Sequence, residues 1–310
     1  MTAAVKTWTV DNAAWTTAQP RLSVLIPFMR DDPCRLLAAL DGRASGAEII
    51  LLDDGTNDAA LSARVAAAVQ ALAIPCRMMT LAANEGRAKG RNRLVSQARA
   101  GAFLFLDSDM LPDSPDFLAN WLKLLDEDQP AVAFGGFALL QAPPSPEHAI
   151  HRAMALRGDC AGAAERRLAP EKYVFTSNLL VQRTVFEAEG FDEGFTGWGW
   201  EDVEWAMRVS RRWPITHIDN TATHLGLDTA QALAAKYEQS TANFRRVVQR
   251  HLAIVSAYPS YRIARMLKLA PLRSVWRPWL RQLACTEGLP VKLRAFSLRL
   301  FRAALYAEAV

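Results

Sequence analysis

Short apolar runs alternate with helical patterns through the first 137 positions. The runs are rich in Val, Ile, Leu and Phe, and they lie at 22–28, 47–54, 76–81, 101–109 and 131–137. Because they are apolar on both faces, they predict the strands of a mostly parallel sheet covered by helices. The helical patterns lie at 33–42, 58–73, 87–99 and 114–128. We expect an α/β doubly wound domain that binds its ligands beyond the carboxyl ends of the strands.

The pattern changes after position 140. Residues 141–172, rich in Ala, Pro and Arg, predict a long loop with one short helix, and such insertions are often lids. A strand-like pair at 173–181, a helix to about Glu189, a helix that opens at Glu201 and a strand at Ile215–Asp219 follow.

Beyond Thr229 the apolar spacing predicts a long amphipathic helix. Its apolar positions are Leu233, Tyr237, Phe244, Val248, Leu252 and Val255. Four later prolines are expected to cut the remainder into short helical pieces. They are Pro259, Pro271, Pro278 and Pro290. The chain thus divides into an N-terminal extension (1–20), an α/β domain (21–228, with halves at about 21–137 and 173–228) and a helical C-terminal region (229–310).

Charge is distributed unevenly along this ordinary globular composition. From Lys236 to the end there are 14 Lys and Arg against 3 Asp and Glu, with 22 against 29 before it, so the C-terminal region is basic. The four cysteines are too far apart for a metal motif or a disulfide framework. There is no secretory h-region and no run of about 20 apolar residues. We expect a cytoplasmic protein that meets a membrane only at its surface.

The pair Asp107 and Asp109 follows the apolar run 101–106. Side chains two apart on an extended chain point to one side, so both carboxylates are expected at the carboxyl edge of the sheet. Carboxylate oxygens suit Mg²⁺ or Mn²⁺, which can neutralise a diphosphate leaving group. The alternative is two exposed acids that begin a turn at Pro112.

A second acidic cluster, Asp53 to Asp58, ends the second strand at the same edge of the sheet. Asp54 could accept a hydrogen bond from a pyrimidine N–H or a ribose hydroxyl. The alternative is that these residues cap the helix at 58–73. The first strand ends close by, at Pro27 and Phe28.

The segment Asn84–Asn92 opens a helix with Arg87, Lys89 and Arg91. Cations at a helix N-terminus attract phosphate, although a solvated basic face is the better account of Lys89.

The segment from Gly197 to Asp202 combines two glycines, Trp198 and Trp200 with the acids Glu201 and Asp202. Indole offers a sugar an apolar face, Gly199 permits a close backbone approach, and a carboxylate beside them could remove a proton from a hydroxyl. The alternative for the acids is stabilisation of a helix N-terminus.

His224 follows the strand at Ile215–Asp219. A neutral imidazole can complete a Mn²⁺ site. A lone histidine is more often a packing residue, and His217 competes for the same role.

These motifs, in this order, resemble the family-2 glycosyltransferases and their GT-A fold from about Leu22 to Gly226. The last motif is similar to that of bacterial chondroitin-type polymerases and β-1,4-galactosyltransferases. The resemblance implies a UDP-sugar donor, a carbohydrate or glycolipid acceptor, Mn²⁺ or Mg²⁺ as cofactor, and a role in bacterial polysaccharide or surface-glycan synthesis. It makes 21–137 the nucleotide-binding half and 173–228 the acceptor-side half.

The resemblance also implies a role for each matching residue. Pro27, Phe28, Asp54, Arg87 and Asp107 would line the nucleotide pocket, and Asp109 and His224 would hold the metal. Trp198, Gly199 and Glu201 would contact sugar, and Asp202 would be the catalytic base of an inverting reaction. Trp200 departs from the family pattern, because it stands where a second glycine is usual.

The basic tail is open to two interpretations. In the last helix Leu289, Leu293, Phe296, Leu300 and Ala304 form a stripe opposite Lys292, Arg299 and Arg302. Residues 260–306 could therefore contact an anionic membrane, or the stripe could pack on the catalytic domain. Nucleic acid is not expected as a partner, since no binding motif accompanies the charge.

Two other classes of protein compete with a glycosyltransferase. A nucleotidyltransferase would need a glycine-rich, basic loop where Pro27–Asp32 stands. A degenerate transferase that serves as a membrane-surface assembly subunit would not be expected to keep Asp107, Asp109 and Asp202.

Overall fold

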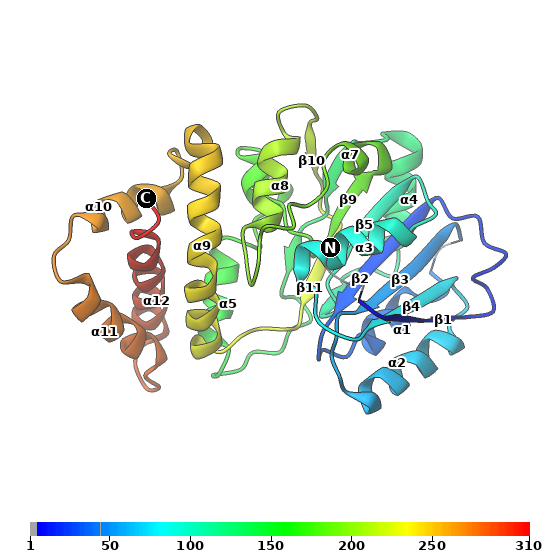
Figure 1. The fold of residues 1–310 in the computed structure, drawn as a ribbon, viewed down its shortest axis with the longest axis horizontal. Helices are drawn as coiled ribbons and strands as arrows, with labels where there is room; N and C mark the ends of the chain where they lie inside the picture. The colour runs from blue at the N-terminus through cyan, green and yellow to red at the C-terminus, as the bar shows by residue number, and fades with distance from the viewer. Residues whose placement is uncertain (1–4, 44) are drawn as a thin grey trace.

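The first strands predicted from the sequence form the parallel centre of a mixed sheet in the computed structural model, which describes residues 5–43 and 45–310. Residues 1–4 of the expected N-terminal extension lie outside this range. The parallel strands are β2 (Leu22–Phe28), β3 (Ala47–Asp53), β4 (Cys76–Leu81) and β5 (Ala102–Phe105). The full order is β1-β4-β3-β2-β5-β9-β7-β10 (Figure 1).

Strands at both sides of this centre make the sheet mixed. β1 (Thr7–Asp11), within the expected extension, pairs antiparallel with β4, and β9 (Leu179–Gln182) runs antiparallel between β5 and β7 (Val132–Phe134). β10 (Ile215–His217) pairs parallel with β7. A second sheet contains β6 (Met110–Pro112), β11 (Ala222–His224) and β8 (Phe137–Ala138).

Helices cover both faces of the large sheet. On one face a core cluster joins the strands to α1 (Cys34–Leu40), α2 (Ala59–Ala71) and α4 (Phe117–Glu127). On the other a second cluster includes α3 (Arg87–Gln97), α7 (Arg183–Ala188) and α8 (Glu201–Val209). Alternate residues of β2 enter the two clusters, as the pleat requires. The expected α/β architecture, a sheet with helices on both faces, is therefore correct.

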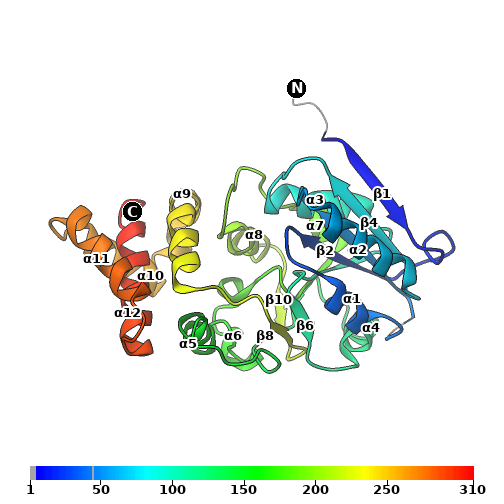
Figure 2. The same cartoon turned by 90° about the horizontal axis from the view of Figure 1, so that it is seen from below.

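The C-terminal region forms a helical layer at the end of the molecule away from β1 (Figure 1, Figure 2). It consists of α9 (Ala230–Val255), α10 (Pro259–Lys268), α11 (Arg273–Cys285) and α12 (Val291–Tyr306). A third core cluster joins these helices to α5 (Ala149–Arg157) and to Met207 of α8. The layer is thus packed onto the α/β domain.

Several local predictions were wrong. The apolar run at 101–109 yields only β5, and β6 of the second sheet begins after it at Met110. The run at 131–137 divides between β7 of the large sheet and β8 of the second. The second run turns at Gly135, which has no room for a side chain beside Trp121 and Asn178, and at Gly136, which has φ +101°. Residues 141–172 contain α5, α6 (Ala163–Arg166) and the 3-10 helix η1 (Pro170–Tyr173) instead of one helix, and 173–181 yields only β9.

The C-terminal helices differ from expectation in two further ways. Pro278 lies inside α11 and does not end it. On α12, Leu293 and Phe296 of the predicted stripe are exposed, whereas Leu298, Phe301 and Leu305 are packed in the core. Within the described residues, no helix has both the length and the apolar character needed to cross a bilayer. All four cysteines are free thiols.

Candidate active site

The acidic cluster after β3 is divided between two helices. Asp58 caps α2 by accepting hydrogen bonds from the N–H groups of Ala60 and Leu61. Asp54 instead reaches the N-terminal side of α3, where it accepts from Asn84 Nδ2 at 2.8 Å and from the N–H groups of Glu85 and Gly86 at 2.7 and 3.1 Å. The capping alternative holds for Asp58, while Asp54 fixes the loop that precedes Arg87.

Two arginines of α3 tie the motifs together. Arg91, which is almost fully buried, donates to Asp107 Oδ1 at 2.7 Å and lies 3.6 Å from Glu201 Oε1. Arg87 Nε donates to Glu201 Oε1 at 2.7 Å, and its Nη2 lies 3.8 Å from Asp107 Oδ2. Residues that are 114 positions apart thus form one ion-pair network at the carboxyl edge of the sheet.

Asp202 stands beside this network, in the first turn of α8. Burial, and then the charge of Glu201, raise the pKa of the Asp202 carboxyl to about 7, although Arg87 acts in the opposite direction. A carboxyl that titrates near neutral pH is suited to accept a proton. The helix-terminus alternative also holds in part, because Asp202 Oδ1 accepts a hydrogen bond from the N–H of Val203, which acts to lower the pKa but is outweighed by burial and Glu201.

Trp200 precedes α8 with φ +78° and ψ −13°, in the left-handed region. The backbone therefore keeps the conformation that glycine adopts most readily, although the residue is tryptophan. Its Nε1 donates to the hydroxyl of Tyr306 at 2.9 Å, and its ring packs on Phe244 with the centroids 4.8 Å apart. Packing from the C-terminal helices thus holds the unusual residue in place.

Asp109 and His224 meet between β6 and β11, with 3.1 Å between Asp109 Oδ2 and His224 Nε2. Burial alone would raise the pKa of Asp109, but the hydrogen bond and charge of His224 outweigh it and hold that pKa below its ordinary value. The pKa of His224 is raised by Asp109 in spite of burial. His217, the competitor, lies against Arg166 and the carbonyl of Pro170 instead.

The chemistry of this pair fits a divalent cation. Asp109 Oδ1 and His224 Nδ1 are buried and have no hydrogen-bond partner in the part of the chain that the structure describes. Across that part, no three His, Cys, Asp or Glu side chains are grouped to hold a metal ion. An ion here would therefore have two protein ligands and would take the others from phosphate and water, as Mg²⁺ commonly does.

The remaining predicted residues belong to the end of β2 and to the loop before α8. The Phe28 side chain is packed in the core, so a nucleotide contact there would come from its main chain, while Pro27 is half-buried. Trp198 packs near Tyr237, with Lys236 5.8 Å from the centre of its ring. Gly199 has φ +88°, and its carbonyl accepts from Asn243.

Several residues near the site were not predicted from the sequence. A Cβ atom on Gly226 would lie 2.0 Å from Asp109 Oδ2, so this position keeps space for the carboxylate. Asp31 has a pKa raised by burial and by the nearby charges of Asp109, Asp107 and Asp228. Arg91 was noted only as a phosphate-attracting cation. The position of Arg91 in the basic motif at the start of α3 was a signal for its place in the site. Nothing in the sequence signalled that Gly226 lies against Asp109.

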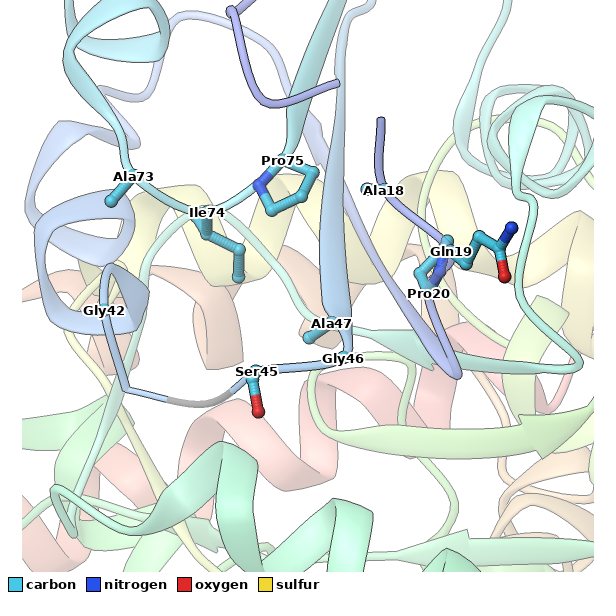
Figure 3. A pocket seen from close by; sticks show the side chains of 10 residues that line it. All are labelled: Ala18, Gln19, Pro20, Gly42, Ser45, Gly46, Ala47, Ala73, Ile74 and Pro75. Atoms are coloured by element: carbon cyan, nitrogen blue, oxygen red, sulfur yellow. The ribbon is translucent and has the colours of Figure 1, made fainter. Parts of the chain in front are cut away.

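A separate hollow of about 430 Å³ lies away from this network, where β3 and β4 begin (Figure 3). It is lined by small, apolar or uncharged residues, among them Ser45, Ile74 and Pro75. It lies at the amino edge of the parallel strands, so it is not part of the candidate site.

Comparison with known families decides the classification. The model of the family described as "Glycosyl transferase family 2" matches residues 23–188, just over half of the chain. The chain belongs to glycosyl transferase family 2. This family-2 chain is a glycosyltransferase, and Asp54, Arg87, Asp107 and Asp109 lie within the matched region. Asp202 and His224 lie beyond it.

Solved structures share the fold of this family-2 member. A mannosyltransferase from Pyrobaculum calidifontis, PcManGT, in complex with GDP-Man and Mn²⁺, aligns with a TM-score of 0.59 and 15% identity over 94% of this chain and 88% of that one. TarS from S. aureus, in complex with UDP-GlcNAc, aligns with a TM-score of 0.53 and 15% identity over 93% and 90%. No curated protein sequence matches the chain.

Proposed function

We propose that this glycosyltransferase transfers a sugar from a UDP-sugar to a hydroxyl of a carbohydrate or glycolipid acceptor, with inversion at the anomeric carbon. One observation carries the proposal: Arg87 bonds to Glu201 at 2.7 Å and lies 3.8 Å from Asp107, so the first turn of α8, with Asp202, and the strand end before Asp109 meet at one side chain. Arg87 therefore lies between the part of the site assigned to the leaving group and the part assigned to the base.

Asp202 is assigned as the general base. In its charged form it removes the proton from the acceptor hydroxyl as the oxygen attacks the anomeric carbon and the bond to the UDP oxygen breaks. The electron pair of that bond leaves with UDP, and the proton stays on Asp202. A single displacement of this kind inverts the anomeric configuration.

The leaving group is assigned to the other side of the site. Asp109 and His224 would hold Mn²⁺ or Mg²⁺, which supplies positive charge to the departing diphosphate. Arg87 and the N-terminus of α3 add positive potential on the same side. Asp54 orients the loop before Arg87, and Asp107 fixes the side chain of Arg91.

The choice of donor is based on the two similar solved structures and on the motif Gly197–Asp202. TarS is solved with UDP-GlcNAc and PcManGT with GDP-Man and Mn²⁺, so a nucleotide-sugar donor is common to both. We assign UDP because Gly197–Asp202 resembles the motif of chondroitin-type polymerases and β-1,4-galactosyltransferases. A role in bacterial polysaccharide or surface-glycan synthesis follows from the same resemblance.

A thermal-shift panel tests the donor and the metal together. UDP-sugars at 100 times Kd should raise Tm by roughly 5 °C in Mn²⁺ and much less in EDTA. Asp109→Ala should remove the metal-dependent part. Asp116→Ala is the matched control, because Asp116 is an exposed acid just before α4 whose side chain caps nothing. A larger shift with GDP-mannose than with any UDP-sugar would overturn the donor assignment.

A second experiment tests the base. Asp202→Asn should keep the UDP-dependent rise in Tm and lose at least about a hundredfold in transfer rate, since general-base catalysis contributes about that much or more. Product configuration, measured by NMR on the first turnover products, should be opposite to that of the donor. Transfer by Asp202→Asn at the native rate, or retained configuration, would contradict the assignment.

A further inference from the structure

Helix α11 carries an apolar stripe that faces away from the protein. Leu272, just before the helix, Val275 and Trp279 are 71%, 58% and 67% exposed, and Leu283 is also exposed. Their spacing of three or four residues places them on one side of the helix. Of the thirteen residues of α11 only Ala284 is buried, so the helix lies on the surface of the layer. A single exposed leucine is ordinary, whereas a continuous stripe with a tryptophan is not.

The two neighbouring helices add further exposed apolar side chains. On and just after α10 these are Ile263, Met266 and Leu269, and on α12 they are Val291, Leu293 and Phe296. The three helices together form the end of the molecule opposite β1 (Figure 1, Figure 2). We call the exposed side of α10, α11 and α12 the apolar end.

The charges of the apolar end have one dominant sign. Residues 259–310 contain ten Lys and Arg against two acids, Glu287 and Glu308. Arg262, Arg265 and Lys292 are exposed and form no ion pair within the described residues. Among the other cations, Arg277 pairs with Glu308. The apolar stripes are therefore flanked by uncompensated positive charge.

We propose that the apolar end docks on the surface of an anionic lipid bilayer, with α11 lying in the headgroup region. Helices that bind in this way place apolar side chains below the headgroups and Lys or Arg beside the lipid phosphates, and tryptophan is favoured at that depth. The same surface suits a second copy of the chain poorly, because a two-fold interface would bring the cations of both copies together.

Vesicle co-sedimentation of the full chain tests the proposal without donor, acceptor or metal. Vesicles of phosphatidylglycerol and phosphatidylcholine (1:1) should bind the protein at least tenfold more tightly than pure phosphatidylcholine, and 0.5 M NaCl should weaken binding, because exposed charges are screened. Trp279→Glu combined with Met266→Glu should lose at least tenfold in affinity. The triple change Arg262→Gln, Arg265→Gln and Lys292→Gln should lose about as much on anionic vesicles only.

Matched controls keep the result specific. Trp8→Glu changes a 48% exposed tryptophan on β1, at the opposite end of the molecule (Figure 1), and Arg35→Gln with Arg43→Gln removes exposed cations near α1. Both variants should bind vesicles like the native chain. Hydrolysis of the donor in solution should be unchanged in every variant. Equal binding to neutral and anionic vesicles, or no loss in the Trp279 and Met266 variant, would overturn the proposal. So would concentration-dependent dimerisation that this variant abolishes, with no vesicle binding.

Discussion

Asp202, the proposed general base, has surroundings that would set the pH range in which the enzyme works. Its pKa is raised to about 7, first by burial and then by the charge of Glu201. A general base acts only when deprotonated, so kcat/KM for transfer should rise about tenfold per pH unit below pH 7 and become constant above it. A profile of kcat/KM from pH 5.5 to 8.5 measures this rise, which is the acid limb of the curve.

Glu201, which precedes Asp202, supplies a control for the pH profile. Glu201→Gln removes the negative charge that raises the pKa of Asp202 and frees Arg87, which lowers it, so the acid limb should move to lower pH whatever happens to the maximal rate. A limb that stays near pH 7 in this variant would assign the titration to another group.

Gly226 gives a second prediction for a single residue. A Cβ atom there would lie 2.0 Å from Asp109 Oδ2 and 2.9 Å from its Cγ, so Gly226→Ala must displace that carboxylate. We expect about a hundredfold loss of kcat and a smaller metal-dependent rise in Tm, because a shift of about 1 Å in a site costs that much. Gly101→Ala, with open space around it, is the matched control. Native metal dependence in Gly226→Ala would contradict a role for Asp109 as ligand.

The sequence predicted the acids of the site better than their surroundings. Asp54, Asp107 and Asp109 follow apolar strands, and parallel strands bring their carboxyl ends to one edge, so convergence followed from the pattern. Gly226 and Asp31 depend on how loops approach one another in space, which no periodicity encodes. To predict the pairing of Arg91 with Asp107, one would need to know which face of α3 lies against the end of β5.

At the scale of elements, the central strands were predicted closely and the later segments were not. β2, β3 and β4 match the apolar runs within a residue at their ends, because each run is buried on both faces. Beyond position 100 the runs continue through turns, as at Gly135, so hydrophobicity alone does not mark where a strand ends.

The C-terminal helices show a different limit of prediction from hydrophobic periodicity. Helix α12 has two apolar stripes, one with Leu293 and Phe296 and another with Leu298, Phe301 and Leu305, and only the second is in the core. Both have helical spacing, so periodicity could not decide which side faces inward. Pro278 is accommodated because the carbonyl it leaves unpaired belongs to Ser274, an exposed residue that water can reach.

The start of α8 leads to a prediction about backbone strain. Trp200 holds φ +78°, which costs a non-glycine residue about 1–2 kcal/mol, and its ring is retained by Phe244 and Tyr306. Trp200→Ala loses the packing and keeps the strain, so it should destabilise by about 3–5 kcal/mol. Trp200→Gly loses the same packing but relieves the strain, so it should be about 1 kcal/mol more stable than Trp200→Ala. Urea unfolding measures both; equal values would show that the strain is absent.

At the scale of the whole molecule, the C-terminal helices share one core with α8 and the loop before it. The third cluster extends from Ile150 to Ala309 and includes Met207 of α8, and Trp198 and Trp200 pack against it. Asn243 of α9 donates to the carbonyls of Thr196 and Gly199. The basic C-terminal region, which the sequence left between two interpretations, therefore packs on the domain through one side and exposes apolar residues on the other.

This shared core predicts an effect on catalysis from the last helix. The Tyr306 hydroxyl accepts from Trp200 Nε1 at 2.9 Å and lies 2.9 Å from Ser240 Oγ, so it fixes the residue just before Glu201 and Asp202. Tyr306→Phe should cost about 1 kcal/mol in unfolding free energy and about tenfold in kcat, with little change in KM for the donor, since the proposed nucleotide contacts lie on the α3 side. Tyr258→Phe is the matched control, because the buried Tyr258 hydroxyl bonds to Glu171 away from the site and should lose similar stability at native kcat. Equal kcat in the two variants would mean that the C-terminal helices stabilise the fold without positioning the base.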